Sequence, residues 1–196
     1  GDRTSIELPE TQREYIRQLQ KTGKPVIFVH LSGSAVALAP EAEACDAILQ
    51  GWYAGQAGGE AVADVLFGDY NPAGRLPVTF YASDSDLPDF GDYDMEGHTY
   101  RYFKGKPLFP FGHGLSYSKF KYRRARIKDG VLRIPVRNVS KTDGDEVVQV
   151  YIKKADDTDG PVMSLRGFKR VNIKGKKKAV VEIPMSEENI DLFNPE

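Results

Sequence analysis

The strongest constraint on the fold is a change in hydrophobic periodicity close to residue 117. Before this point, apolar residues occur at helical spacing and in continuous runs; after it, they alternate with polar residues. A helix repeats every 3.6 residues and a strand every two, so the two patterns require different architectures. We therefore expect an α/β domain over residues 1–117 and an all-β domain over 118–196.

The first part carries continuous apolar runs of strand length. A strand with little alternation is usually buried on both faces, as in a parallel sheet. The predicted strands cover residues 26–31, 47–52 and 76–80. A helix from about Thr11, with a capping box between Thr11 and Glu14, precedes the first strand, and a helix closed by Gly68 follows the second. This order predicts a layered α/β sandwich with a mostly parallel sheet, of which the chain holds the second part.

The second part has the short, alternating strands of a β-sandwich. Apolar residues alternate over 132–136, 148–152 and 179–185. Turns are expected at Asp129-Gly130, Asp143-Gly144 and Lys174-Gly175. About five strands are recognisable, whereas a complete fibronectin-like sandwich needs roughly seven, so we expect this sandwich to be incomplete.

A long connection without periodicity spans residues 82–111. It is rich in acidic and aromatic side chains. A connection of this length inside a compact domain is usually functional or forms a lid.

The composition excludes several classes of function. The net charge is −1, so no nucleic-acid partner is expected. A single cysteine, Cys45, allows neither an internal disulfide nor a cysteine metal site, and we expect it to be a small buried thiol. No run approaches the roughly 20 apolar residues of a membrane span, so no membrane partner is expected.

Long segments of the chain resemble glycoside hydrolase family 3. The matching segments are DRTSIELPETQREYI (2–16), GKPVIFVHLSGSAVAL (23–38), ILQGWYAGQAGGEAVADVLFGDYNPAGRLPVTF (48–80), YRYF (100–103) and PLFPFGHGLSYSKFKY (107–122). The later run GDEVVQVYIKK…LRGFKRV (144–171) resembles the fibronectin type III-like module of many members. The glycines of GQAGGEA lack the spacing of a phosphate-binding loop, so we read them as structural.

The resemblance implies a retaining exo-acting β-glycosidase, of β-glucosidase or β-xylosidase type, that needs no cofactor. Such an enzyme places two carboxyl groups only about 5–5.5 Å apart. In the family, the nucleophile is an Asp of an N-terminal (β/α)8 barrel, and the acid/base is a Glu shortly before the position that matches Gly1. No catalytic residue is therefore carried over to this chain. We expect a C-terminal fragment, inactive alone, that acts on an oligosaccharide together with the barrel.

Local carboxylates offer weaker alternatives. Glu41 and Glu43 are expected on a solvated face. Three alternating acids close to His98 suggest a site for a hard cation, but the rest of a calcium-binding loop is missing, so no metal site is predicted.

The substrate-proximal candidates lie in the long connection. They are Tyr93, His98, Tyr100 and Arg101. An aromatic and acidic loop can offer ring faces and charged groups to a sugar. In the competing interpretation, Tyr100, Tyr102 and Phe103 pack between the two domains and Arg101 pairs with an Asp.

Other expectations concern context. A non-catalytic carbohydrate-binding or scaffold module is the alternative function. The usual location of relatives predicts a secreted or periplasmic protein, and exposed sheet edges predict association in isolation. Asn138-Val139-Ser140 matches a glycosylation sequon, a motif that is commonly unused.

Overall fold

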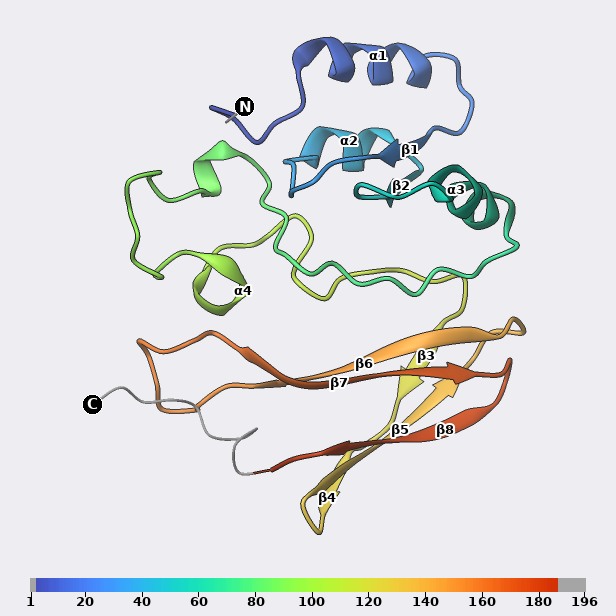
Figure 1. Ribbon diagram of the computed structural model, residues 1–196, viewed down its shortest axis with the longest axis vertical. Helices are drawn as coiled ribbons and strands as arrows, with labels where there is room; N and C mark the ends of the chain where they lie inside the picture. The colour runs from blue at the N-terminus through green and yellow to red at the C-terminus, as the bar shows by residue number, and fades with distance from the viewer. Residues whose placement is uncertain (1–2, 187–196) are drawn as a thin grey trace. The chain divides into compact units, whose positions relative to one another are not determined.

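The computed structural model describes residues 3–186, and its contacts divide this part of the chain into two compact units. The first unit holds residues 3–64 and 77–111, and the second, which we call the β-unit, holds residues 65–76 and 112–186. The predicted mixed class is confirmed, because parallel strands and helices come first and antiparallel strands follow (Figure 1). The chain thus leaves the β-unit after residue 76 and re-enters it at residue 112.

The first unit begins with alternating helices and strands. They are α1 (Glu10–Gln20), β1 (Ile27–His30), α2 (Ala39–Ala44) and β2 (Ala47–Gln50). Helix α3 (Gly58–Phe67) follows; it begins in the first unit, and its last three residues belong to the β-unit. Strands β1 and β2 pair in parallel, with Ile27 opposite Ala47, as the continuous apolar runs predict. Their burial is only partial, since Ile27 is half exposed, so the expectation of burial on both faces is wrong for these strands.

Helix α1 begins one residue earlier than the predicted capping box. Pro9 is the N-cap residue, and no side chain caps the helix, so the box between Thr11 and Glu14 is wrong. The backbone carbonyl of Pro9 instead accepts hydrogen bonds from the N–H groups of Gln12 and Arg13. Helix α3 ends as predicted, with Gly68 at a φ of +88°.

The expected strand over 76–80 does not form. Phe80 makes an isolated antiparallel bridge with Phe109, and both backbone hydrogen bonds of that bridge are present. Pro77 has no N–H group to donate to a ladder, which limits strand pairing here. Short helical turns follow at Asp84–Asp86 (η1) and Thr99–Tyr102 (α4).

The β-unit contains six strands among the described residues. They are β3 (Phe120–Tyr122), β4 (Arg126–Lys128), β5 (Val131–Asn138), β6 (Gly144–Ile152), β7 (Ser164–Ile173) and β8 (Lys178–Pro184). Strand β5 pairs antiparallel with β3, β4 and β8, and β6 pairs antiparallel with β7. Any strand that completes the sandwich after residue 186 lies outside the described residues.

The alternating residues form the core of the β-unit, as the period of two predicts. The buried cluster is Ile134, Val136, Val148, Ile173, Val181, Ile183 and Met185. The expected turn at Asp129-Gly130 joins β4 to β5 with both residues at positive φ, the geometry of a type I′ hairpin. The expected turn at Asp143-Gly144 is wrong, because β6 already begins at Gly144.

The sequon residue Asn138 lies in this core, fully buried. Its side-chain nitrogen donates to the carbonyls of Thr142 (2.8 Å) and Ile173 (2.9 Å), and its oxygen accepts from the N–H of Ser140 (2.9 Å). Asn138 is therefore a structural residue of the folded β-unit.

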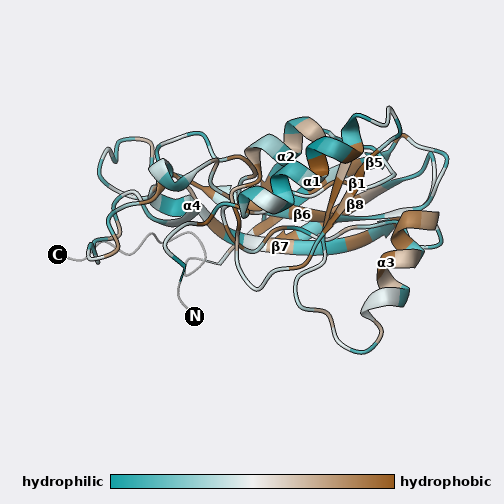
Figure 2. Cartoon of the chain, turned by 90° about the horizontal axis from the view of Figure 1, so that it is seen from above, coloured by the Kyte–Doolittle hydropathy of each residue, from teal (hydrophilic) through white to brown (hydrophobic). Residues whose placement is uncertain are grey.

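Hydrophobic side chains also lie at the surface. Figure 2 shows hydrophobic residues along α3, where Phe67 is exposed and Leu66 is partly so. Cys45 is half-buried rather than buried. Its burial, and to a smaller extent the nearby charge of Glu41, raise the pKa of its thiol. None of the described helices has the length and apolar character required to cross a membrane.

Candidate functional site

Four of the six acidic side chains of segment 82–111 accept hydrogen bonds from backbone N–H groups. The Asp86 carboxylate accepts from the backbone N–H of Ala82 at 2.9 Å and completes a capping box with Ser83 around η1. Asp84 accepts from the N–H of Ile6 at 2.7 Å. The same kind of bond links Asp89 to Gly91 N and Asp92 to Asp94 N. These carboxylates satisfy backbone donors, as in Asx-turns, rather than converging on one point.

No metal-binding cluster is present in the described part of the chain. There, no three His, Cys, Asp or Glu side chains lie close enough to hold an ion. Glu96 instead forms an exposed ion pair with Lys104, at 3.0 Å.

The side chain of Tyr100 packs against another aromatic ring of the first unit. Its ring stacks on Phe111 with centroids 4.1 Å apart and planes 14° from parallel. Nearby, Phe103 makes an edge-on contact with Tyr81 at 4.9 Å. Both contacts lie within the first unit, so these aromatic residues fix the shape of the segment.

Tyr93 is the candidate with the freest side chain. It is 91% exposed, and Phe90, three residues before it, is 97% exposed. Aromatic side chains are usually buried because their apolar area is large, so two almost fully exposed rings in one loop are unusual. Phe90 was not among the predicted site residues.

His98 and Arg101 flank an unusual backbone conformation. Thr99 lies between His98 and Tyr100 with a φ of +52°, which is rare for a β-branched residue. The Nδ1 atom of His98 lies 3.1 Å from the carbonyl oxygen of Glu96. Arg101 is exposed, and among the described residues it forms no ion pair, in contrast to the pairing with an Asp in the competing interpretation.

A buried ion pair lies elsewhere in the first unit, between α1 and α2. Arg13 Nε donates to Glu41 Oε1 at 3.1 Å, and Glu41 is only 2% exposed. The expectation that Glu41 belongs to a solvated face is wrong, because the arginine compensates its burial. A groove of about 270 Å³ beside this pair is lined by both residues and by Glu43.

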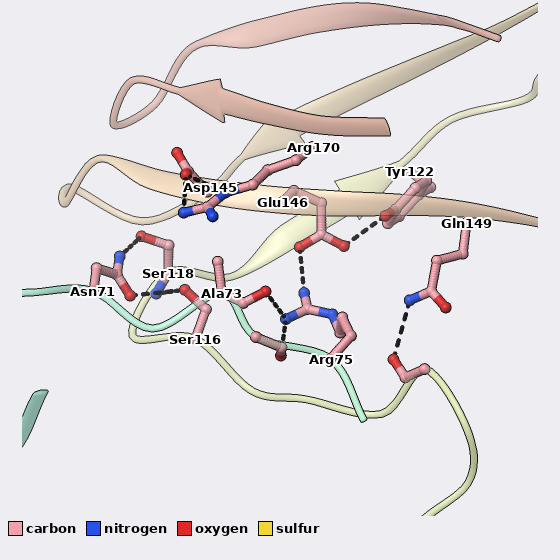
Figure 3. Close-up of polar contacts among 12 residues, drawn as sticks. Asn71, Ala73, Arg75, Ser116, Ser118, Tyr122, Asp145, Glu146, Gln149 and Arg170 are labelled. Carbon is pink, nitrogen blue, oxygen red and sulfur yellow. Dashed lines mark hydrogen bonds and ion pairs between the residues drawn. The ribbon is translucent and has the colours of Figure 1, made fainter. Parts of the chain in front are cut away.

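The β-unit contains a polar network that sequence reasoning missed (Figure 3). The side chain of Asn71 makes four hydrogen bonds. Its oxygen accepts from Ser116 Oγ (2.8 Å) and Tyr117 N (2.9 Å). Its nitrogen donates to Ser118 Oγ (3.0 Å) and to the carbonyl of Asp143 (2.8 Å). Asn71 thus joins the segment before β3 to the start of β6.

Arg75 and Glu146 form the second part of this network. The Arg75 Nη2 donates to Glu146 Oε2 at 3.0 Å, and both side chains are nearly buried, with 12% and 11% exposed. The other arginine nitrogen, Nη1, donates to the carbonyls of Ala73 and Gly74. Tyr122 donates to Glu146 Oε1 at 2.6 Å, and its burial, together with this bond and the glutamate charge, raises the pKa of the phenol.

Two glycines allow the backbone to approach closely here. A Cβ at Gly114 would lie 2.0 Å from the carbonyl oxygen of Gly74, and one at Gly112 would lie 2.1 Å from Gln149 Oε1. Gly112 also has a φ of +79°. The expected bend at Phe111-Gly112-His113-Gly114 is therefore required by space as well as by backbone conformation.

One signal in the sequence could have revealed the network. Glu146 lies two residues before Val148 on β6, and Asn138 lies two residues after Val136 on β5, so both occupy inward positions of their own alternating patterns. A buried polar residue needs a partner, so these two positions predict buried hydrogen bonds, although the sequence does not show that the partner of Glu146 is Arg75.

The chain belongs to glycosyl hydrolase family 3. Residues 1–117 match the profile of the "Glycosyl hydrolase family 3 C-terminal domain", and residues 146–196 match that of the "Fibronectin type III-like domain". The resemblance inferred from the sequence is confirmed.

The chain is similar to several longer glycosidases. It is 54% identical over its whole length to a xylan 1,4-beta-xylosidase from Xylanibacter ruminicola, of which it covers 23%. It is 36% identical over 99% of its length to a periplasmic beta-glucosidase from Salmonella typhimurium, of which it covers 28%. Among solved structures, 96% of it superposes on 25% of a beta-glucosidase from Kluyveromyces marxianus, with a TM-score of 0.85 and 31% identity. The chain therefore spans about a quarter of the length of these relatives.

Proposed function

We propose that this chain is the C-terminal part of a retaining, exo-acting β-glycosidase that removes terminal β-linked xylose from oligosaccharides. The observation that carries the proposal is the 54% identity over the whole chain to a xylan 1,4-beta-xylosidase, against 36% to the beta-glucosidase above. The family resemblance carries neither catalytic carboxylate over to this chain, which covers 23% of that xylosidase, so we assign both carboxylates to the rest of the parent protein. The chain alone is then inactive.

Several features of the chain suit it to packing against further polypeptide. Strands β1 and β2 pair only with each other among the described residues, so each keeps an open edge there. Phe67 on α3 is 83% exposed. Exposed apolar side chains and open strand edges favour association, and the rest of the parent protein is the proposed partner. A secreted or periplasmic location is proposed from the relative named as periplasmic.

Segment 82–111 is the proposed substrate-facing part of this chain. Tyr93 is its exposed aromatic ring, Arg101 its exposed cation, and Phe90 is added as a second exposed ring. His98 and Tyr100 are retained as supports, because strain at Thr99 is the kind of backbone feature that clusters at binding sites. Sugar rings pack on aromatic faces, so the exposed rings of Phe90 and Tyr93 are suited to contact a sugar.

The test compares this chain with the same chain preceded by its natural upstream sequence. Both are assayed with nitrophenyl β-xyloside and nitrophenyl β-glucoside. We expect turnover only by the longer polypeptide, with the higher kcat/KM for the xyloside. Turnover by the purified 196-residue chain would refute the assignment of both carboxylates to the rest of the protein. In the longer polypeptide, Tyr93→Ala and Arg101→Ala should raise KM, whereas Tyr15→Ala, at an exposed position on α1, should not.

A non-catalytic carbohydrate-binding module is the second candidate. The exposure of Phe90 and Tyr93 favours it, since binding modules present aromatic rings to sugars. Calorimetric titration of the chain alone with xylose and glucose oligomers separates the two functions. Binding at millimolar concentration or tighter, without hydrolysis by the longer polypeptide, would support the module.

A further inference from the structure

The β-unit includes two stretches of chain that the family profile places in the preceding domain. The profile of the C-terminal domain runs to residue 117, whereas residues 65–76 and 112–117 belong to the β-unit by their contacts. Between these stretches, residues 77–111 belong to the other unit. The stretches at 65–76 and 112–117 are therefore the two attachment points of the segment that carries the candidate sugar-binding residues.

The two attachment points are bonded directly to each other. The N–H of Gly112 donates to the carbonyl of Leu76 at 2.8 Å, and the N–H of Leu76 donates to the carbonyl of His113 at 2.8 Å. The chain thus leaves and re-enters the β-unit at one place. Segment 77–111 is a closed loop whose ends are joined by this pair of hydrogen bonds.

Strand β6 holds each attachment point through a side chain (Figure 3). Glu146 accepts from Arg75, next to Leu76, at 3.0 Å. Gln149 donates from Nε2 to the carbonyl oxygen of Gly112 at 3.0 Å, and its Oε1 accepts from Tyr151 at 2.6 Å. Side chains of one strand, β6, therefore bond to the chain on both sides of the loop.

The bond between Arg75 and Glu146 joins two charged groups that each need a partner. Arg75 and Glu146 are both close to nine-tenths buried, so either charge left alone would be costly. Tyr122 donates to the second oxygen of Glu146, so both carboxylate oxygens have a partner. The absence of a side chain at Gly112 and Gly114 lets the backbone reach this position.

We infer that the β-unit acts as a clamp that fixes both ends of segment 77–111, and that Arg75, Glu146 and Gln149 are positioning residues for that segment. The clamp requires only the contacts above. Its consequence for catalysis rests on the proposed function, because it assumes that the segment faces substrate in the parent protein. Glu182, which pairs with exposed Arg133 at 2.8 Å, provides a matched control within the same unit.

The first arm of the test measures hydrogen exchange of the full 196-residue chain. The reporters are the amides of Phe80 and Phe109, which bond to each other's carbonyls inside the segment and outside the β-unit. We expect Glu146→Gln to speed their exchange by about tenfold or more, and Gln149→Ala to speed it less. Glu182→Gln should leave it unchanged. If Glu146→Gln unfolds the whole β-unit, the milder Gln149→Ala decides the question. Unchanged exchange at both reporters in a folded Gln149→Ala variant would overturn the clamp.

The second arm measures kcat and KM for nitrophenyl β-xyloside with the longer polypeptide. If the clamp positions a substrate-facing segment, Glu146→Gln and Gln149→Ala should raise KM severalfold, whereas Glu182→Gln should not. If exchange increases in the first arm while the kinetic constants stay unchanged, the clamp stands and the substrate-facing role of segment 77–111 fails. The two inferences are therefore refuted by different results.

Discussion

Replacing Asn138 with alanine should cost the β-unit a large part of its stability. The side chain is fully buried on β5 and bonds three backbone groups: the N–H of Ser140 and the carbonyls of Thr142 and Ile173. Alanine would leave the Ser140 N–H and the Ile173 carbonyl without this partner, whereas the Thr142 carbonyl would keep its bond from Ser118 Oγ at 2.9 Å. A buried polar group that loses its partner costs about 1–3 kcal/mol, and carbonyls tolerate the loss better than N–H groups. We therefore expect about 3–5 kcal/mol, against a typical domain stability of about 5–15 kcal/mol.

The matched control is Asn172→Ala, the same substitution at an exposed position of β7. Asn172 makes one side-chain hydrogen bond, to Asp145 at 2.7 Å. Because water can replace that bond, we expect a loss below about 1 kcal/mol.

The free energy of unfolding of both variants is measured in urea, with amide exchange on β5 and β8 as the probe of the β-unit. The fluorescence of Trp52 reports separately on the other unit. A loss for Asn138→Ala no larger than that for Asn172→Ala would refute the reasoning, because it would mean that the buried backbone groups find other partners.

Three further predictions address packing, surface and charge. Gly114→Ala should lower the thermal midpoint of the β-unit, with a cost of about 1–3 kcal/mol, whereas Gly74→Ala, which meets no atom within 4 Å, should be nearly neutral by calorimetry. Phe90→Ser should change the free energy of unfolding by less than about 0.5 kcal/mol, since the ring is almost fully exposed. The pKa of Asp145 is lowered, mainly by the hydrogen bond from Asn172 and further by Arg170, although burial acts in the opposite direction. A lowered folded-state pKa stabilises the protein above the unfolded value, near 3.9, and this contribution is lost as the pH falls through the folded-state pKa. Asp145→Asn should therefore lower the thermal midpoint at pH 7 but have little effect near pH 2.

The overall class was predictable because hydrophobic period is a local signal. The parallel pairing of β1 with β2 follows from two continuous apolar runs, and the core of the β-unit follows from alternation. The strand expected over 76–80 failed because its apolar run contains Pro77, which has no N–H group, and because Leu76 bonds to the 112–113 backbone instead. Pattern alone cannot show such competition, since it depends on which distant segment arrives at the same place.

The polar network was less predictable, because its partners are far apart in sequence. Arg75 and Glu146 are separated by 71 positions, and nothing near Arg75 distinguishes it from a surface arginine. The alternating pattern of β6 places Glu146 at an inward position, so the sequence shows a polar residue where an apolar one is expected. The division at residue 117 stays a prediction, which limited proteolysis of the chain would test.

The acidic character of segment 82–111 first suggested a site, and the structure gives four of its six acids a backbone partner. Carboxylates of this segment bond to backbone N–H groups, Asp86 to two of them, and Asp84 to that of Ile6. A long segment with little regular secondary structure must satisfy its backbone by such caps. These acids are therefore explained without substrate, whereas the exposed rings of Phe90 and Tyr93 are not. Because caps and fixed ends would hold the backbone of the segment in one shape, the two rings would be presented at defined positions. Any recognition by this segment should thus depend on the aromatic pair and on the attachment points rather than on its carboxylates.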